Sequence, residues 1–202
     1  MTGSGEASAQ GSAGGSAGAS AGTSAPGGSP HRHAHSHGHE HERRTAGRAL
    51  VVTVSNRASA GVYEDTGGPV LAAGLVDAGF AVDGPRVVPD GDPVGQALRA
   101  ALEQGYDVVV TTGGTGLAPT DATPEQTRPL LDREVPGLAD ALRTLGREQG
   151  VPTAVLSRGL AGVAGRTLVV NVAGSPGACR DAVTLLGSVL PHAVDQLRGG
   201  DH

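Results

Sequence analysis

The most informative segment of the chain is Val108-Val109-Val110-Thr111-Thr112-Gly113-Gly114-Thr115-Gly116. Three consecutive valines predict a parallel strand that is buried on both faces of a sheet. The glycines that follow allow a sharp turn and let backbone N–H groups approach a ligand closely. The pattern predicts either an anion-binding turn or a structural β-to-α turn without a ligand, since glycine turns are common in α/β proteins.

A predicted helix starts soon after this turn. Thr123 is the candidate N-cap, Pro124 takes the first helical position, and Gln126 completes a capping-box pattern. Asp121 lies just before this helix start. Because a helix N-terminus and a group of converging amides both attract phosphate, the segment is a candidate anion site.

The same alternation of elements continues through the chain. Apolar runs at 49–54, 80–88, 106–112 and 167–172 predict strands. Predicted helices begin at the prolines at positions 69, 93, 124, 136 and 176, with helices expected over 124–132 and 136–148. Asp92 and Ser175 are further candidate N-caps. Alternating strands and helices predict an open, mostly parallel α/β sheet with helices on both faces.

Composition divides the 202 residues into two parts. Residues 1–46 are mostly Gly, Ser, Ala, Thr and His and lack the apolar residues that offset the entropy of ordering, which predicts a disordered tail. Residues 47–198 have the length of one compact domain. The chain has only three aromatic residues, so stacking platforms for single-stranded nucleic acid are not expected.

The tail carries an alternating histidine tract. Imidazole is a good ligand for Ni, Zn and Cu, so the tract could be a transition-metal tether, or a solvated segment whose metal affinity is incidental. Its members are His31, His33, His35, His37, His39 and His41.

Charge and composition exclude several classes of function. The first 46 residues are balanced in charge, so the excess of −5 falls on the remainder, which argues against a nucleic-acid binder. The chain contains no lysine, which excludes a Walker A phosphate loop. The single Cys179 is compatible with a reducing compartment. No segment approaches 18 apolar residues and no signal peptide is recognisable, so we expect a cytoplasmic protein that does not bind membranes.

Several segments carry a family resemblance by their order and spacing, namely 54–69, 87–90, 111–116, 121–125, 132–137, 157–158 and 174–176. On these segments the chain resembles the Mog/MoaB family of molybdenum cofactor biosynthesis proteins from about Ala49 to Leu197. The resemblance implies a three-layer α/β domain of the molybdopterin-binding fold. It also implies a homotrimer or hexamer, and handover of the product to a MoeA-type molybdenum insertase.

This resemblance implies that the protein is a molybdopterin adenylyltransferase. In that reaction AMP passes from ATP to the terminal phosphate of molybdopterin, and pyrophosphate leaves. Asp90 and Asp121 match the two acidic positions of the family, so we expect both to be catalytic and to bind Mg²⁺. The alternatives are a loop carboxylate for Asp90 and an acid favoured by the helix dipole for Asp121.

Further substrate and phosphate contacts are implied for a group of small and basic residues. Arg158 could instead be a surface salt-bridge partner. Arg57 is a candidate anion ligand because it follows the first strand. The group is Thr112, Gly113, Gly114, Thr115, Gly116, Ser157, Ser175, Arg158 and Arg57.

Two residues depart from the family pattern, and the second of them, Thr120, favours the MoaB-like branch. Asn56 stands where the family often has an acid, and Thr120 stands where active members commonly have a basic residue. They keep open a second function, that of a molybdopterin-binding carrier without turnover. A dinucleotide-binding oxidoreductase is set aside, because no Gly-x-Gly-x-x-Gly pattern follows the first strand.

Overall fold

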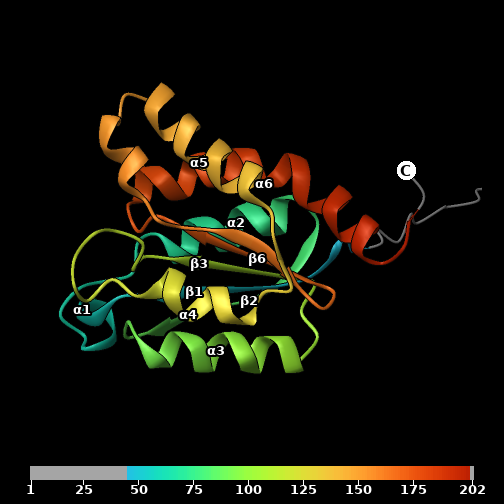
Figure 1. Cartoon of the computed structure of the whole chain (residues 1–202), viewed down its shortest axis with the longest axis horizontal. Coiled ribbons are helices and arrows are strands. Elements are labelled where there is room, and N and C mark those ends of the chain that lie inside the picture. The colour runs from blue at the N-terminus through green and yellow to red at the C-terminus, as the bar shows by residue number, and fades with distance from the viewer. Residues whose placement is uncertain (1–44, 201–202) are drawn as a thin grey trace, which may run out of the picture. The chain divides into compact units, whose positions relative to one another are not determined.

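The computed structural model describes residues 45–200, which form alternating strands and helices (Figure 1). The histidine tract lies outside the described residues. The elements in chain order are β1 (Gly47–Val54), α1 (Asn56–Ser59), α2 (Gly68–Asp77), β2 (Phe80–Val88), α3 (Asp92–Glu103), β3 (Val108–Thr112), α4 (Thr123–Thr127), η1 (Arg128–Leu130), β4 (Arg133–Glu134), α5 (Pro136–Glu148), η2 (Pro152–Leu156), β5 (Ala161–Ala164), β6 (Thr167–Val172) and α6 (Pro176–Leu197).

The strands form a six-stranded sheet in the order β2-β1-β3-β6-β5-β4. Strands β2, β1, β3 and β6 are parallel, so the predicted mostly parallel sheet is confirmed. Strands β5 and β4 extend the sheet with antiparallel pairing. The carboxyl ends of the four parallel strands meet at one edge, where open α/β sheets bind their ligands.

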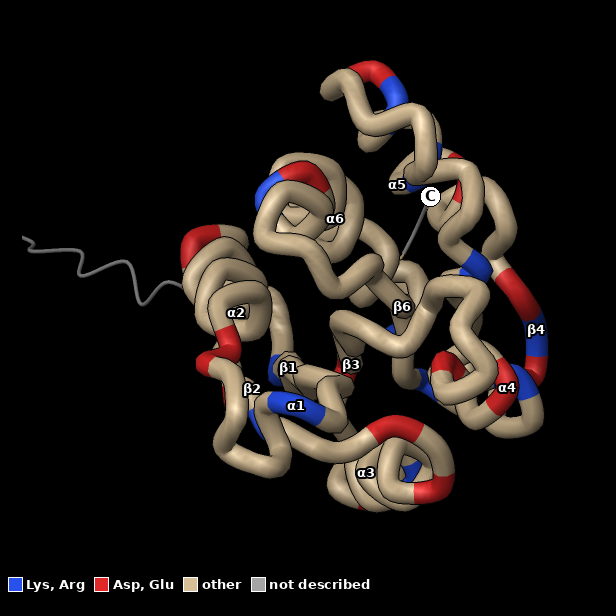
Figure 2. The backbone as a smooth tube through the Cα atoms, turned by 90° about the vertical axis from the view of Figure 1, so that its left-hand side faces the viewer, with Lys and Arg blue, Asp and Glu red and all other residues tan. Residues whose placement is uncertain are grey.

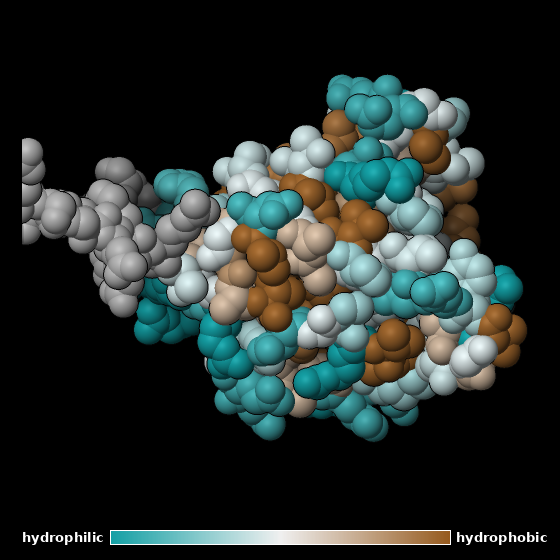
Figure 3. Space-filling view, turned by 180° about the vertical axis from the view of Figure 1, so that it is seen from behind, coloured by the Kyte–Doolittle hydropathy of each residue, from teal (hydrophilic) through white to brown (hydrophobic). Residues whose placement is uncertain are grey.

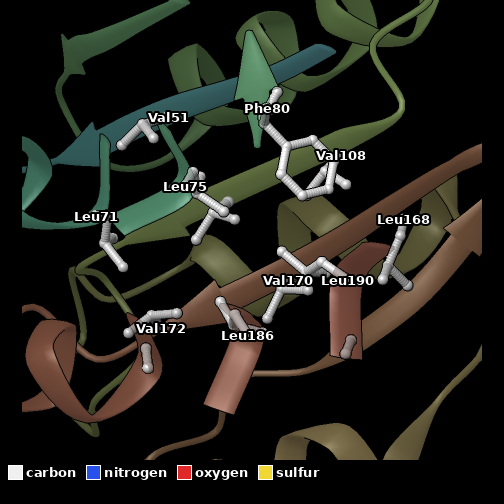
Figure 4. Packing of buried hydrophobic residues seen from close by; sticks show 14 of the residues in the cluster. Val51, Leu71, Leu75, Phe80, Val108, Leu168, Val170, Val172, Leu186 and Leu190 are labelled. Carbon is white, nitrogen blue, oxygen red and sulfur yellow. The ribbon is translucent and has the colours of Figure 1, made fainter. Parts of the chain in front are cut away.

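Helices cover both faces of the sheet, as predicted. Helices α2, α5 and α6 lie on one face, and α3 and α4 lie on the other (Figure 1). Strand β1 shows how the sequence achieves this arrangement: Val51 faces the core under α2 and α6, whereas Leu50 and Val52 face the core over α3. The first core also holds Leu71 and Leu186, packed as Figure 4 shows. Apolar residues at every position of a strand are therefore explained by burial on both sides.

Three of the predicted helix starts are wrong by one residue, and the first is α2, which begins at Gly68 rather than Pro69. Helix α4 begins at Thr123 itself, after Ala122, and Thr123 makes no capping hydrogen bond. Helix α3 begins at Asp92, after Gly91. The helix predicted over 124–132 is instead α4 followed by the short η1, and the chain then enters β4. Ser175 does cap α6, because its Oγ accepts a hydrogen bond from the backbone N–H of Ala178 at 3.2 Å.

The surface carries dispersed apolar side chains. Figure 3 shows them on one face as separate areas among polar residues. Exposed large apolar residues include Val76 on α2, Leu117 in the loop after β3, and Leu156 at the end of η2. Within residues 45–200, none of the helices has the length and apolar character needed to cross a membrane.

Candidate functional site

The glycine turn after β3 is held tightly between two neighbouring strands. Gly113 has φ +101° and Gly114 has φ +61°, backbone conformations that L side chains rarely adopt. A Cβ on Gly113 would fall closer than 3.0 Å to the carbonyl oxygen of Val54. The N–H of Gly113 donates to Val172 O at 3.0 Å. Glycine is therefore required for the turn to fit between the ends of β1 and β6.

A second turn, after β6, meets the first. A Cβ on Gly174 would lie 3.1 Å from the Cα of Gly113, so the two backbones approach each other closely. The hydroxyl of Thr112 donates to Ala173 O at 3.1 Å and lies 3.3 Å from the thiol of Cys179. Burial raises the pKa of the Cys179 thiol, which the Thr112 hydroxyl partly opposes. Thr112 is thus buried beneath the turns and does not line the cleft described below.

Asp90 follows β2 and reaches across to the loop before α4. Its Oδ1 accepts hydrogen bonds from the N–H groups of Gly91 at 2.7 Å and Ala122 at 3.2 Å. The side-chain oxygen of Asn56 accepts the N–H of Asp90 at 2.9 Å and fixes its backbone. Burial raises the pKa of Asp90, and the charges of Asp121 and Glu125 raise it further.

Asp121 lies at the other side of the same loop. Its Oδ2 accepts the N–H of Ala118 at 3.1 Å and would lie 2.7 Å from a Cβ on Gly116. Ala122, the residue after Asp121, donates its N–H to the Asp90 carboxylate, so the two predicted acidic residues belong to one structural unit.

This pair of carboxylates fits a magnesium ion that substrate helps to bind. Mg²⁺ prefers oxygen ligands and is often held by one or two carboxylates together with substrate phosphates. Oδ2 of Asp90 and Oδ1 of Asp121 have no hydrogen bond from residues 45–200. The described residues contain no group of three or more His, Cys, Asp and Glu side chains suited to a metal ion. Substrate oxygens would therefore have to complete the coordination.

Arg158 holds the loop that runs from Gly116 to Asp121 in place. Its Nε donates to Gly116 O at 2.7 Å and one Nη donates to Asp121 O at 2.6 Å. The other Nη forms an ion pair with Glu125. Arg158 does not line the cleft, so its interactions in this structure are those of a loop-positioning residue. Ser157 does line it, and its Oγ donates to Thr115 Oγ1 at 3.2 Å.

Arg57 lies away from the glycine turn. It is exposed on α1, where its guanidinium stacks 5.1 Å from the centre of the Tyr63 ring. It does not line the cleft. Figure 2 looks onto this edge of the sheet and shows charged residues around it on α1, α3 and α4.

A cleft of about 570 Å³ opens above the two turns, between α5 and α6. It brings together most of the predicted phosphate-binding residues, from Gly113 to Gly116, with Ser157 and Ser175. Asp121 lines the cleft, and Asp90 does not. Ser175 lies at the N-terminus of the 22-residue helix α6, whose dipole favours an anion there.

Sequence reasoning missed the walls of the cleft. Leu142 and Arg143 of α5, Asn171 of β6 and Asp181 of α6 all line it. The guanidinium of Arg143 donates to the carbonyl oxygens of Ser157 at 3.2 Å and Gly159 at 2.9 Å, and it pairs with Asp140 at 2.6 Å. The helical periodicity of α5 indicated which residues share a face, but not that this face borders a cleft.

Asn171 anchors α4 to the sheet through a buried polar network. Its Nδ2 donates to the hydroxyls of Thr111 at 3.0 Å and Thr127 at 3.1 Å. Thr127 in turn donates to the carbonyl oxygen of Thr123 at 2.8 Å. The hydroxyl of Thr123 is fully buried and has no hydrogen-bond partner among residues 45–200.

Comparison with known proteins finds one protein family that matches most of the described chain. Residues 50–192 match a family model described as a probable molybdopterin binding domain. A molybdopterin adenylyltransferase of Haemophilus influenzae is 42% identical over 138 residues, which cover 66% of this chain and 69% of that protein. The corresponding Escherichia coli K12 protein is 34% identical over 156 residues, covering 73% of this chain and 79% of that protein.

One longer relative contains a comparable region as only part of its length. A molybdenum cofactor biosynthesis bifunctional protein of Chlorobaculum tepidum is 37% identical over 157 residues. The match covers 77% of this chain and 50% of the longer protein.

Solved structures resemble the chain in both fold and sequence. The molybdopterin biosynthesis Mog protein from Mycobacterium ulcerans is 49% identical, with a TM-score of 0.72, and the match covers 77% of this chain and 99% of that one. MoaB from Thermus thermophilus is 44% identical, with a TM-score of 0.70, covering 76% and 97%. The family match, the curated relatives and these structures agree, and the chain belongs to the Mog/MoaB family of molybdenum cofactor biosynthesis proteins.

Proposed function

We propose that this protein transfers AMP from ATP to the terminal phosphate of molybdopterin and releases pyrophosphate. The observation that carries the proposal is the convergence of a glycine turn, a helix N-terminus and a carboxylate on one cleft. Relatives at 34–42% identity that are named molybdopterin adenylyltransferases support the same activity.

The reaction joins two phosphate groups and needs little covalent assistance. An oxygen of the molybdopterin phosphate attacks the α-phosphorus of ATP, and the bond from that phosphorus to the bridging oxygen of pyrophosphate breaks. A phosphate monoester is largely deprotonated at neutral pH, so the nucleophile needs no general base. The protein contributes chiefly by positioning the two groups and stabilising charge.

Each part of the cleft has a role in this scheme. The N–H groups of Gly114 to Gly116 would donate to phosphate oxygens, and the N-terminus of α6 at Ser175 would hold a second phosphate. Asp121, supported by Asp90, would hold Mg²⁺. When bound, the ion neutralises phosphate charge and polarises the α-phosphate. Arg158 would keep the turn in register through Gly116 O.

A carrier that binds molybdopterin without turnover is the second candidate. It is favoured by the lack of an unpaired cation among the described residues that line the cleft. Thr120 stands where the family commonly has a basic residue, and the Arg143 guanidinium is engaged with Ser157, Gly159 and Asp140.

A turnover assay separates the two functions. We would combine the purified chain with molybdopterin, ATP and Mg²⁺ and measure adenylyl-molybdopterin and pyrophosphate. We expect Asp121→Asn to lower the rate by about 100-fold or more, because it removes charge from the metal-binding pair. Asp77→Asn removes an equal charge from the exposed surface of α2 and should leave the rate unchanged. Molybdopterin binding without product would support the carrier instead.

We also propose a homotrimeric or hexameric assembly, and a MoeA-type molybdenum insertase as the recipient of the product. A second groove between α5 and α6, separate from the cleft of the candidate site, is apolar and is lined by Leu138, Leu185 and Val189. This groove supports self-association. Light scattering on the purified chain would measure the number of subunits.

A further inference from the structure

The wall of the cleft formed by α6 changes character along the helix. Gly177, Ala178 and Asp181 line the cleft, at positions i, i+1 and i+4, which share one helical face. The first two side chains are small and leave room for a flat group. The third is a carboxylate, about one turn further from the helix N-terminus.

The carboxylate of Asp181 does not help to hold residues 45–200 together. It is partly buried and makes no hydrogen bond or ion pair with any residue in the described part of the chain. The cation across the cleft, Arg143, is already bonded to two carbonyl oxygens and to Asp140. A half-buried carboxylate beside apolar walls gains most from N–H donors, because these replace the water that it loses.

The position of Asp181 restricts what it can contact. It lies six positions after Ser175, which corresponds to roughly 9 Å along the helix axis. The helix N-terminus attracts an anion, whereas a carboxylate repels one. The ligand that suits this wall therefore has phosphate at one end and uncharged N–H donors about 9 Å away.

We propose that Asp181 selects the heterocyclic end of the substrate by accepting two adjacent N–H groups from a 2-amino-4-oxopteridine. This inference rests on the proposed function and assigns the pterin, rather than adenine, to the part of the cleft between α5 and α6. The ring N3–H and the 2-amino group point the same way and match the two oxygens of a carboxylate.

Adenine does not satisfy the same carboxylate. Its 6-amino group lies next to the N1 acceptor, so one carboxylate oxygen would face a lone pair. A site built to accept two donors rejects a ligand that lacks one of them, because a buried acceptor is then left unpaired. Leu142 and Ala139 of α5 provide an apolar surface for the opposite side of the ring.

The test compares two fluorescent ligands that differ only in this hydrogen-bonding edge. The first is 6-hydroxymethylpterin phosphate, and the second is its lumazine counterpart, in which an oxo group replaces the 2-amino group. We expect the wild-type protein to bind the pterin about 10- to 100-fold more tightly than the lumazine. Asp181→Asn should abolish that preference, while the affinity for ATP with Mg²⁺ stays within about twofold.

Asp77→Asn is the matched control and should keep the full preference for the pterin. Circular dichroism would confirm that both variants fold, as expected for carboxylates without partners in the described chain. An equal loss of pterin and lumazine binding in Asp181→Asn, or a loss of ATP binding instead, would overturn the assignment.

The adenylylation assay distinguishes this failure from failure of the proposed function. A wild-type protein that makes adenylyl-molybdopterin but shows no preference for the pterin refutes the role of Asp181 alone. A protein that neither binds the pterin nor forms product refutes the function on which that role rests.

Discussion

Replacing Gly114 with alanine should be far more damaging than replacing Gly105, although the two backbones are similar. Gly114 has φ +61° and Gly105 has φ +68°, so each alanine variant bears the cost of a left-handed conformation, about 1–2 kcal/mol. At Gly105 an added Cβ meets nothing within 4 Å. At Gly114 it would lie closer than 3.0 Å to Asp90 Oδ2 and Thr123 Oγ1.

The additional loss of stability in Gly114→Ala comes from the side chain that the new Cβ displaces. Thr123 is fully buried, so the Asp90 carboxylate has to turn away, giving up its bonds to the N–H groups of Gly91 and Ala122. Hydrogen bonds to a charged acceptor contribute about 1.5–3 kcal/mol each. Because Asp90 is only partly buried, we take the low end and expect Gly114→Ala to lose about 2–4 kcal/mol more than Gly105→Ala.

Urea unfolding of both variants measures this difference directly. A double variant that adds Asp90→Ala to Gly114→Ala removes one of the two groups with which the new Cβ collides. It should recover part of the loss, which appears as non-additivity in a double-mutant cycle. Equal losses for the two glycine variants would show that the carboxylate does not stand over Gly114, and the geometry of the site would have to be revised.

Two further predictions concern buried hydroxyls and acid stability. Thr127→Val should lower the free energy of unfolding by about 1–2 kcal/mol, because the Thr127 hydroxyl forms hydrogen bonds with Asn171 and Thr123. Thr123→Val removes a hydroxyl that has no partner among residues 45–200, so it should raise the free energy of unfolding by up to about 1 kcal/mol. Equal losses for the two variants in urea unfolding would contradict this. The hydrogen bond from Tyr106, with further help from Arg48, lowers the pKa of Asp83. That contribution to stability is present above pH 3.8 and is lost as pH falls through the folded-state pKa, so the stability difference between wild type and Tyr106→Phe should shrink in acid unfolding curves.

The parallel part of the fold was predictable because each strand carries its own signal. Runs such as Val108–Val110 have no polar residue to place in solvent, so they must be buried on both faces. The antiparallel edge has no such signal. Strand β5 reads Ala161-Gly162-Val163-Ala164, and β4 has only two residues, so neither shows alternation or β-branched enrichment.

The glycine turn and the helix cap at Ser175 could be found from local patterns, but several other site features depend on distant contacts. Thr123 has the sequence pattern of an N-cap, yet its backbone N–H donates to Gly114 O and its side chain is buried against the site. Arg158 meets Gly116 across 42 positions of the sequence, after α5 and η2 have led the chain back to the glycine turn. The sequence likewise offered no sign that Asp181 lines the cleft, since an acid on an amphipathic helix ordinarily faces solvent.

The cleft attracts phosphate without an excess of positive charge, and this affects how a substrate arrives. Among the described residues that line it, Arg143 is the one cation, beside the acids Asp121 and Asp181. Amides and helix dipoles act only at short range, so an approaching polyanion is not steered from a distance. Association should therefore proceed at the ordinary 10⁵–10⁷ M⁻¹s⁻¹ of unassisted encounters and respond weakly to ionic strength, with selection made after contact.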